Sequence, residues 1–153
     1  MKIADMLKQE YIIEELQSYG KEEVLRELAG IFPQRGIAVD PQVVTKVLLE
    51  REKLGSTGIG DGIAIPHGKL PGLTEPIVAF GRSRHGVAFD AMDGRPVHLF
   101  FLLMAPENTA SQYLKTLAKI SRMLKDGGFR RHLLAAKSVD EIYQAVAERD
   151  DSC

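Results

Sequence analysis

The stretch VHLFFLLM, residues Val97–Met104, is the clearest sign of the fold in this chain. All but one of its residues are apolar, and it includes β-branched and aromatic side chains. A run of this kind, without alternation between apolar and polar residues, is typical of a strand that is covered on both faces. The run therefore predicts a central strand in a sheet that lies between other layers.

Shorter apolar segments elsewhere predict further strands. We expect Ile77–Ser83 to form a strand, followed by a turn at His85–Gly86 and a partner strand at Val87–Phe89. Two more short strands are expected at Tyr11–Ile13 and Ile63–Ile65, and the second of these ends at a proline. Together with the central run, these segments provide the strands of one sheet.

Helical patterns surround the strands along the chain. Apolar residues recur there with the 3.6-residue period of an amphipathic helix. Helices that come before, between and after strands indicate the α/β class. We therefore predict a single domain, residues 1–153, with a mixed β-sheet flanked by helices on both faces. The expected helices are Lys21–Phe32, Pro41–Lys53, Leu114–Leu124 with a stop at Gly127–Gly128, Phe129–Ala136, and a last helix after Ser138.

Several helices carry start signals. Asp40 can cap one helix, and Pro41 suits its first turn because proline lacks the N–H that would be unpaired there. Thr109–Gln112 and Ser138–Glu141 both fit the capping box, in which two side chains satisfy free N–H groups reciprocally. In the helix after Thr109, we expect the apolar stripe that begins at Leu114 to face the core.

Composition and charge exclude several classes of protein. The chain has 153 residues, 44% of them apolar, which is enough for one domain with a core. Its net charge is −1, so no overall field attracts nucleic acid or an anionic membrane. The single cysteine, Cys153, permits no internal disulfide and no cysteine-rich metal site. The early charges of MKIADMLKQE do not fit a signal peptide, and no apolar run approaches the roughly 20 residues of a membrane span. We expect a cytoplasmic protein that neither binds nucleic acid nor inserts into a membrane.

The stretch GSTGIGDGIAIPHGK, Gly55–Lys69, concentrates glycines around one histidine. A Walker loop would need a lysine at the position of Asp61, whose negative charge would repel a nucleotide phosphate. A dinucleotide fingerprint would need a different glycine spacing and a helix after it. The four histidines of the chain show no local ligand spacing, so we expect neither a metal nor a cofactor.

The remaining candidate is His67 as a nucleophile. A neutral imidazole is available at physiological pH because its ordinary pKa is ~6.5. Attack on a phosphoryl group would form a phosphohistidine, which needs positioning and stabilisation of charge on the phosphoryl oxygens. Backbone N–H groups of the glycine loop, the hydroxyls of Ser56 and Thr57, and the guanidinium of Arg51 are the candidate donors.

Each of these residues also has an ordinary structural interpretation. A single loop histidine can simply be a surface residue or one with a satisfied hydrogen bond. Arg51 suits the end of a helix, where a cation interacts well with the helix dipole. Ser56 and Thr57 beside glycines are common in turns. The residues alone leave both interpretations open.

A longer comparison of motifs favours the chemical interpretation. The segment REKLGSTGIGDGIAIPHG, Arg51–Gly68, strongly resembles the active-site signature of the enzyme IIA domains of the bacterial sugar phosphotransferase system, of the fructose/mannitol type. The likeness is strongest to the nitrogen-regulatory branch. It continues in FDAMDGRPV, Phe89–Val97, in the apolar strand that ends at Ala105–Pro106, and in the segment Leu114–Leu124.

The resemblance implies an α/β fold and a set of roles. It implies that His67 accepts a phosphoryl group from a small histidine phosphocarrier protein and that Arg51 helps to hold it. The loop around Ser56, Thr57 and Gly58 would bind the phosphate and present a flat surface to the carrier. Family members usually have a second histidine near the first, and the matching position here is Tyr113. A phenol donates one hydrogen bond but cannot become a cation.

Two functions of different kinds follow from this resemblance. The first is a phosphotransferase-system component that passes its phosphoryl group to a IIB-type acceptor or uses it as a switch toward a regulated protein. The lack of a membrane span or fused transporter segment favours regulation over sugar transport. The alternative is a scaffold that is never phosphorylated and binds partner proteins through the same surface.

Overall fold

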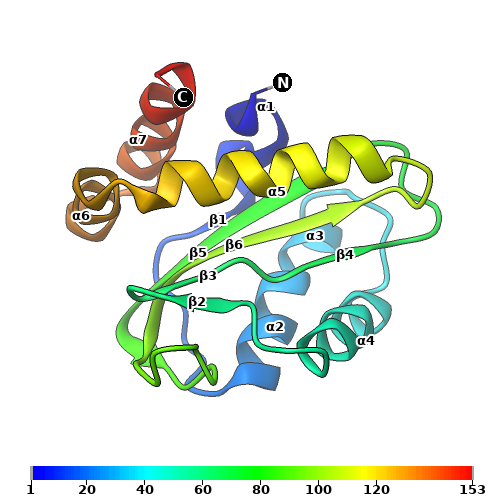
Figure 1. The fold of residues 1–153 in the computed structure, drawn as a ribbon. Helices are drawn as coiled ribbons and strands as arrows, with labels where there is room; N and C mark the ends of the chain where they lie inside the picture. Colours follow the sequence, from blue (N-terminus) through cyan, green and yellow to red (C-terminus); the bar gives the residue numbers. More distant parts are fainter. Residues whose placement is uncertain (1, 153) are drawn as a thin grey trace.

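A mixed sheet forms the centre of the molecule in the computed structural model, which describes residues 2–152 (Figure 1). Met1 and Cys153 therefore lie outside the described residues. The expectations about Cys153 concern a residue that the structure does not describe. The sheet has the strand order β1-β5-β6-β3-β2, and β4 pairs with β6 beyond β3. Its strands are β1 (Ile12–Ile13), β2 (Gly58–Gly60), β3 (Ile63–Ala64), β4 (His67–Lys69), β5 (Ile77–Val87) and β6 (Val97–Ala105).

Strand β6 is the central strand that the apolar run predicts. It pairs antiparallel with β5 and parallel with both β3 and β4, and all its residues except His98 are buried. The half-buried His98 is satisfied because its Nδ1 lies 2.8 Å from the backbone oxygen of Ser83. Helices on the two faces of the sheet account for this burial, since a strand next to water on one face would alternate with polar residues.

The helices lie on both faces of the sheet. Figure 1 shows α5 running along one side, with α2 and α4 on the opposite side. This arrangement confirms the predicted α/β class with a mixed sheet between helices. Within residues 2–152, no helix has the length and apolar character needed to cross a bilayer. The helices are α1 (Ile3–Leu7), the 3₁₀ turn η1 (Gln9–Tyr11), α2 (Lys21–Ala29), α3 (Ile31–Gln34), α4 (Pro41–Glu52), α5 (Ala110–Lys125), α6 (Gly127–Ala135) and α7 (Val139–Asp151).

The predicted caps have different outcomes. Asp40 accepts a hydrogen bond of 2.9 Å from the N–H of Gln42, as expected for the start of α4. Ser138 likewise accepts from the N–H of Glu141 at 3.1 Å. The capping box at Thr109 is wrong, because its hydroxyl donates to the oxygen of Pro106 at 2.9 Å instead of accepting from the helix.

The predicted hairpin at His85–Gly86 is wrong. Strand β5 continues through this pair, and its register against β6 shifts between Arg82 and Val87. Gly86 has a φ of +88°, so it forms an irregularity within a strand rather than a turn between two strands. A bulge and a turn need the same backbone freedom from glycine, which explains why the local signal misleads.

Helix boundaries and faces also differ from the prediction. The segment Lys21–Phe32 is divided at Gly30 into α2 and α3. Gly127–Gly128 begin α6, where Asp126 caps them, rather than ending the preceding helix. Leu114 does not face the core, because 64% of its surface is exposed. The core-facing residues of α5 are Thr116, Lys119, Ile120, Met123 and Leu124.

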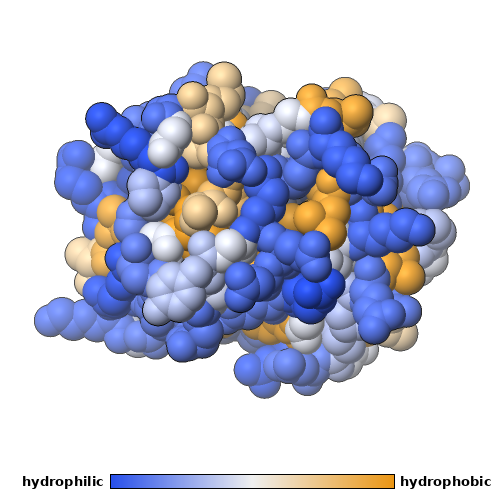
Figure 2. Space-filling model, turned by 90° about the horizontal axis from the view of Figure 1, so that it is seen from below, coloured by the Kyte–Doolittle hydropathy of each residue, from blue (hydrophilic) through white to orange (hydrophobic). Residues whose placement is uncertain are grey.

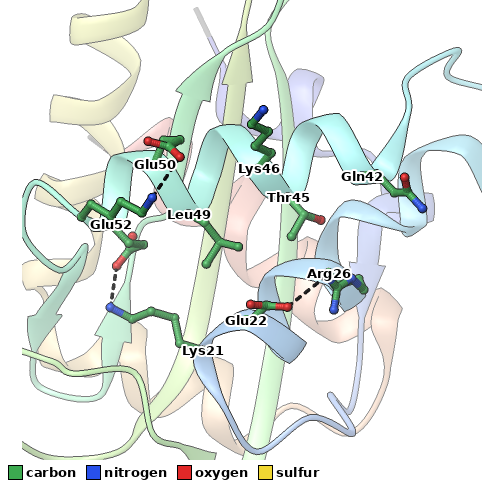
Figure 3. Close-up of a pocket in the computed structure, with 10 residues that line it drawn as sticks. Lys21, Glu22, Arg26, Gln42, Thr45, Lys46, Leu49, Glu50 and Glu52 are labelled. Atoms are coloured by element: carbon green, nitrogen blue, oxygen red, sulfur yellow. Dashed lines mark hydrogen bonds and ion pairs between the residues drawn. The ribbon is translucent and has the colours of Figure 1, made fainter.

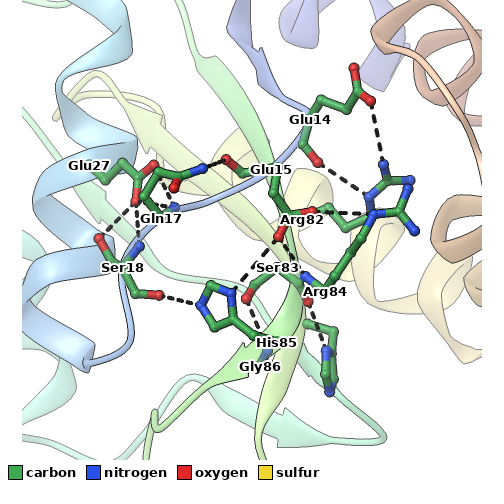
Figure 4. Close-up of polar contacts among 11 residues, drawn as sticks. Glu14, Glu15, Gln17, Ser18, Glu27, Arg82, Ser83, Arg84, His85 and Gly86 are labelled. Atoms are coloured by element: carbon green, nitrogen blue, oxygen red, sulfur yellow. Dashed lines mark hydrogen bonds and ion pairs between the residues drawn. The ribbon is translucent and has the colours of Figure 1, made fainter.

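A buried arginine on β5, Arg82, attaches α6 to the sheet. Arg82 on β5 is fully buried, and its guanidinium donates to the oxygens of Leu133 and Ala136 at 2.8 and 2.6 Å. Its Nε also donates to the oxygen of Glu14 at 3.2 Å (Figure 4). The last carbonyls of a helix lack partners within that helix, so Arg82 satisfies groups that would otherwise be buried without a hydrogen bond.

Candidate active site

His67 lies at the start of β4, immediately after Pro66. Strand β4 is held between β6, where His67 pairs with Leu103, and helix α4. Gly68 makes this packing possible, because a Cβ at that position would lie only 2.6 Å from Cγ1 of Val47. A side chain there would push β4 away from α4, so the residue after the histidine must be glycine.

The imidazole of His67 has a defined hydrogen-bonding state. Its Nδ1 lies 2.5 Å from the backbone oxygen of Ile65, and a carbonyl can only accept, so Nδ1 carries the hydrogen. In the neutral ring, Nε2 then carries the lone pair. Burial lowers the pKa of His67, and the nearby Arg51 lowers it further, against the opposing effects of the Ile65 bond and of Glu52. The ring is therefore neutral at physiological pH.

Arg51 and His67 line the same hollow, which has a volume of about 190 Å³. Arg51 is in the last turn of α4, and its guanidinium donates to the oxygen of Gly55 at 2.9 Å. That bond uses one of several guanidinium N–H groups and fixes the side chain at the edge of the hollow. The other residues around the hollow are Ser56, Thr57, Ile59, Ile65, Leu117 and Ser121.

Ser56 and Thr57 reach the hollow, but their donors bond to protein groups. The hydroxyl of Ser56 donates to the oxygen of Phe89 at 3.0 Å and accepts from the N–H of Gly58 at 3.0 Å. Both the N–H and the hydroxyl of Thr57 donate to the carboxylate of Glu52. The predicted phosphate donors of this loop are thus engaged in holding the loop itself.

The glycines of the loop have two separate functions. Gly58 allows β2 to pack closely, because a Cβ there would lie 3.0 Å from both Cα and Cβ of Ala91. Gly60 and Gly62 have positive φ angles of 99° and 77°, and with Asp61 between them they form the tight turn from β2 to β3. Glycine is therefore required here for close approach and for left-handed backbone.

Tyr113 lies beside the histidine. The centroids of the Tyr113 and His67 rings are 5.9 Å apart, with the rings inclined by 58°. Burial raises the pKa of Tyr113 to about 12, so the phenol is neutral throughout the physiological range. The ammonium of Lys69 lies 5.5 Å from the Tyr113 ring centroid, which brings a second cation to this side of the site.

Exposed apolar side chains lie on the elements that border the hollow. Ile59 on β2 is 42% exposed, Leu114 on α5 is 64% exposed, and Leu54 beside the loop is 84% exposed. Met92 is 80% exposed and is joined to β2 by the bond from its N–H to the oxygen of Gly58. Large apolar side chains gathered around a reactive group are typical of a surface that contacts another protein.

A more voluminous groove lies elsewhere on the molecule. A groove of about 820 Å³ lies between α2 and α4 and contains no histidine (Figure 3). Figure 2 shows the face on which these helices lie, where hydrophilic residues predominate and apolar residues appear in patches between them. The charged side chains that line the groove are largely paired with each other, for example Arg26 with Glu22 at 3.1 Å and Lys53 with Glu50 at 3.1 Å. The groove offers volume but no histidine among its lining residues.

Comparison with known proteins agrees with this geometry. Residues 5–149 match the family model described as "Phosphoenolpyruvate-dependent sugar phosphotransferase system, EIIA 2". The chain belongs to this EIIA type-2 family. The resemblance that the sequence motifs indicate is therefore confirmed.

Individual EIIA relatives come from both the regulatory and the sugar-specific branches. The chain is 41% identical to a nitrogen regulatory protein of Bradyrhizobium diazoefficiens, over 96% of this chain and 95% of that protein. It is 37% identical to the fructose-specific EIIABC component of Bacillus subtilis, but the match covers 98% of this chain and only 24% of that relative. The crystal structure of nitrogen regulatory protein IIA-Ntr from Neisseria meningitidis superposes with a TM-score of 0.88 at 33% identity, over 94% of this chain and 98% of that one.

The EIIA sequence pattern points to most of the site but not to all of it. His67, Arg51, Ser56 and Thr57 meet around one hollow, and Tyr113 lies next to the His67 ring. The carboxylate of Glu52 is part of the site as well, although no sequence motif considered above singles it out. Its position as an acidic residue at the C-terminal end of a helix, where the dipole disfavours a negative charge, is the signal that could have found it.

Proposed function

We propose that Nε2 of His67 accepts a phosphoryl group from the phosphohistidine of a small carrier protein. The observation that carries this proposal is the bond from Nδ1 of His67 to the oxygen of Ile65, which leaves the lone pair on Nε2. Membership of the EIIA family supports it. The alternative of a scaffold that is never phosphorylated has no comparable support, because a scaffold needs no oriented imidazole.

The transfer step can be written with its charges balanced. The Nε2 lone pair attacks the phosphorus, the P–N bond to the carrier's histidine breaks, and its electron pair returns to that nitrogen. The carrier's ring carries a hydrogen on its other nitrogen, so it leaves as a neutral imidazole, and the positive charge passes to the phosphorylated ring of His67. The hydrogen on Nδ1 stays in its bond to Ile65. Both histidines are imidazoles, so the group moves between similar acceptors and transfer can occur in both directions.

Arg51 is the fixed cation for the phosphoryl oxygens in this proposal. We expect Arg51→Lys to slow phosphoryl uptake about tenfold or more, although the charge is kept. A lysine lacks the planar fork that binds two oxygens at once, and one lost charge-assisted bond costs ~1.5–3 kcal/mol. Uptake rates from the phosphorylated carrier measure the effect, with the exposed Lys53→Arg as the control. A wild-type rate for Arg51→Lys would remove Arg51 from the site.

Tyr113 supplies a neutral group beside the phosphoryl position. We expect Tyr113→Phe to slow uptake only modestly, because a neutral phenol stabilises the charge on the phosphoryl oxygens less than a cation does. We expect Tyr113→His to add an inflection near pH ~6–7 to the rate profile, because a second imidazole then titrates there. Rate profiles of the two variants against wild type measure both effects. Identical profiles for wild type and Tyr113→His would contradict an electrostatic role for this position.

The lowered pKa of His67 leads to a prediction for wild type. The nucleophile is the neutral ring, so uptake fails only when the ring is protonated. Because burial and Arg51 lower the pKa of His67 below ~6.5, the midpoint of the acid fall in uptake is expected below that pH. Initial rates between neutral and acidic pH, with pre-phosphorylated carrier, measure this. An inflection above pH ~6.5 would contradict the lowered pKa.

The recipient of the phosphoryl group is a further part of the proposal. Known structures include a complex of enzyme IIAMtl with phosphorylated enzyme IIBMtl from Escherichia coli, to which this chain is 26% identical with a TM-score of 0.75. Several relatives are named nitrogen regulatory proteins. We favour a regulatory switch in the cytoplasm over sugar transport, with the exposed apolar residues around the hollow as the surface that carrier and regulated protein contact.

One experiment tests the function directly. The protein is incubated with phosphoenolpyruvate and the general phosphotransferase proteins, and its intact mass is measured. We expect a mass gain of one phosphoryl group, which is lost in acid and stable in base as for a phosphoramidate. An unchanged mass with a competent donor would favour the unphosphorylated scaffold instead.

A further inference from the structure

The buried carboxylate of Glu52 has no part in the chemistry described so far. Glu52 is the last residue of α4, next to Arg51, and only 8% of its surface is exposed. A negative charge at the C-terminal end of a helix is unfavourable because the helix dipole is negative there. Burial of the charge adds to this cost, so its partners must compensate for both.

Thr57 provides the first partners. Its N–H donates to one oxygen of the Glu52 carboxylate at 3.1 Å, and its hydroxyl donates to the other oxygen. Both donors of a single residue are thus directed at one buried charge. Charge-assisted bonds of this kind are about twice as strong as neutral ones, so they fix the position of Thr57 closely.

Thr57 is connected to the nucleophile through two more hydrogen bonds. Its backbone oxygen accepts from the N–H of Ile65 at 3.0 Å. The backbone oxygen of Ile65 then accepts from Nδ1 of His67. The chain of contacts therefore runs from the Glu52 carboxylate through Thr57 and Ile65 to the imidazole. The Ile65 carbonyl determines which nitrogen of His67 carries the hydrogen. Glu52 holds this carbonyl in place indirectly, through Thr57 and the backbone of Ile65.

Lys21 provides the counter-charge from the opposite side. Its ammonium lies 3.0 Å from the Glu52 carboxylate, at the edge of the groove between α2 and α4 (Figure 3). It also lies 3.6 Å from Asp90 and 4.8 Å from the centroid of the Phe89 ring. The backbone oxygen of Phe89 accepts a hydrogen bond from Ser56. The Lys21–Glu52 ion pair therefore contacts the loop twice, through Thr57 and through Phe89.

We propose that Glu52, paired with Lys21, is a positioning residue that orients the His67 imidazole through Thr57 and Ile65. The proposal rests on the phosphoryl-acceptor function of His67. Glu52 does not touch the phosphoryl group. It holds the loop so that the Ile65 carbonyl stays aligned with Nδ1 and Nε2 keeps its lone pair toward the hollow.

The test uses Glu52→Gln in the full chain, with Glu50→Gln as the matched control. Glutamine keeps the shape of Glu52 but removes the charge, so Lys21 loses the nearer of its two counter-ions and Thr57 loses one acceptor. Glu50 is on the same helix and is exposed, so its replacement removes an equal charge without touching the loop. Two readouts are measured: phosphoryl uptake from the phosphorylated carrier, and the ¹⁵N shifts of the His67 ring, which report which nitrogen is protonated.

We expect Glu52→Gln to slow uptake about 10- to 100-fold, as for a nucleophile misplaced by a fraction of an ångström to an ångström. We also expect the Nε2-protonated form of His67 to increase in the unphosphorylated protein. Glu50→Gln is expected to match wild type in both readouts. Thr57→Val, which removes only the hydroxyl, is expected to change both in the direction of Glu52→Gln.

Unchanged ring shifts in a folded Glu52→Gln variant would overturn the proposal, even if uptake slows, because the effect would then not pass through His67. If Glu52→Gln does not fold, Thr57→Val decides by the same two readouts. The ring shifts are measured without phosphate. A wild type that takes up no phosphoryl group would therefore refute the function while the shifts still decide the role of Glu52.

Discussion

Replacement of His67 with alanine is expected to abolish phosphoryl uptake, with no labelling above background. The imidazole is the proposed nucleophile, and neither the loop hydroxyls nor Tyr113 can replace it at neutral pH. The hydroxyls of Ser56 and Thr57 are bonded to Phe89 and Glu52, and the pKa of Tyr113 is raised to about 12. The loss is therefore expected to be complete rather than partial.

The fold should tolerate this change, because His67 is partly exposed and its side-chain hydrogen bond is to the backbone oxygen of Ile65, while alanine keeps the main-chain pairing of β4 with β6. Intact mass after incubation with the phosphorylated carrier is the measurement, and thermal unfolding checks the fold. His132→Ala is the control, since this exposed histidine lies on α6 away from the hollow. Labelling of the His67→Ala variant to the wild-type extent would show that another residue carries the group.

Replacement of Arg82 with methionine is expected to lower the free energy of unfolding by about 3–5 kcal/mol. The guanidinium is buried and donates to the backbone oxygens of Glu14, Leu133 and Ala136. Each hydrogen bond from a charged donor contributes ~1.5–3 kcal/mol, and a buried carbonyl left without a partner adds its own cost. Part of the loss is recovered because methionine no longer needs to bury a charge, which is why the expected value lies below the sum.

Urea unfolding followed by circular dichroism measures the change in the free energy of unfolding, and a thermal scan measures the change in Tm. For a chain of this length, 1 kcal/mol corresponds to a shift of about 2–4 °C in Tm, so a fall of about 10 °C is expected. Arg84→Met is the control, because the Arg84 side chain is 60% exposed and its ion pair with Glu15 is on the surface. Its effect should stay within about 0.5 kcal/mol. Equal losses for the two variants would contradict the role of Arg82 in holding α6.

The two residues illustrate how function and stability are separated in this fold. Arg82 acts at one end of β5 and β6 by attaching α6, whereas His67 lies at the opposite end of β6, where β4 pairs with Leu103–Ala105. Changes at one end are therefore expected to leave the other nearly unaffected, since distant sites contribute independently.

Features that depend on neighbours in the chain can be predicted from the amino-acid sequence. The uninterrupted apolar run of β6 indicates burial on both faces, because no polar residue alternates with the apolar ones. Asp40 and Pro41 mark the start of α4, because both act on N–H groups within the same turn. The long motif around His67 identifies the family, since many residues of fixed type occur at fixed spacing.

Features that depend on residues far apart in the chain become visible in the folded structure alone. A glycine at position 86 fits a turn or a bulge equally well, and pairing of Val87 with Val97 selects the bulge. Leu114 fits the helical stripe of α5, yet its side chain is 64% exposed while Thr116 on the same helix is buried. The tautomer of His67 and the role of Glu52 follow from hydrogen bonds to Ile65 and Thr57, whose geometry depends on how β2, β3 and α4 come together. Local propensity acts over one turn or one strand, whereas a hydrogen bond between elements exists only after the chain has packed.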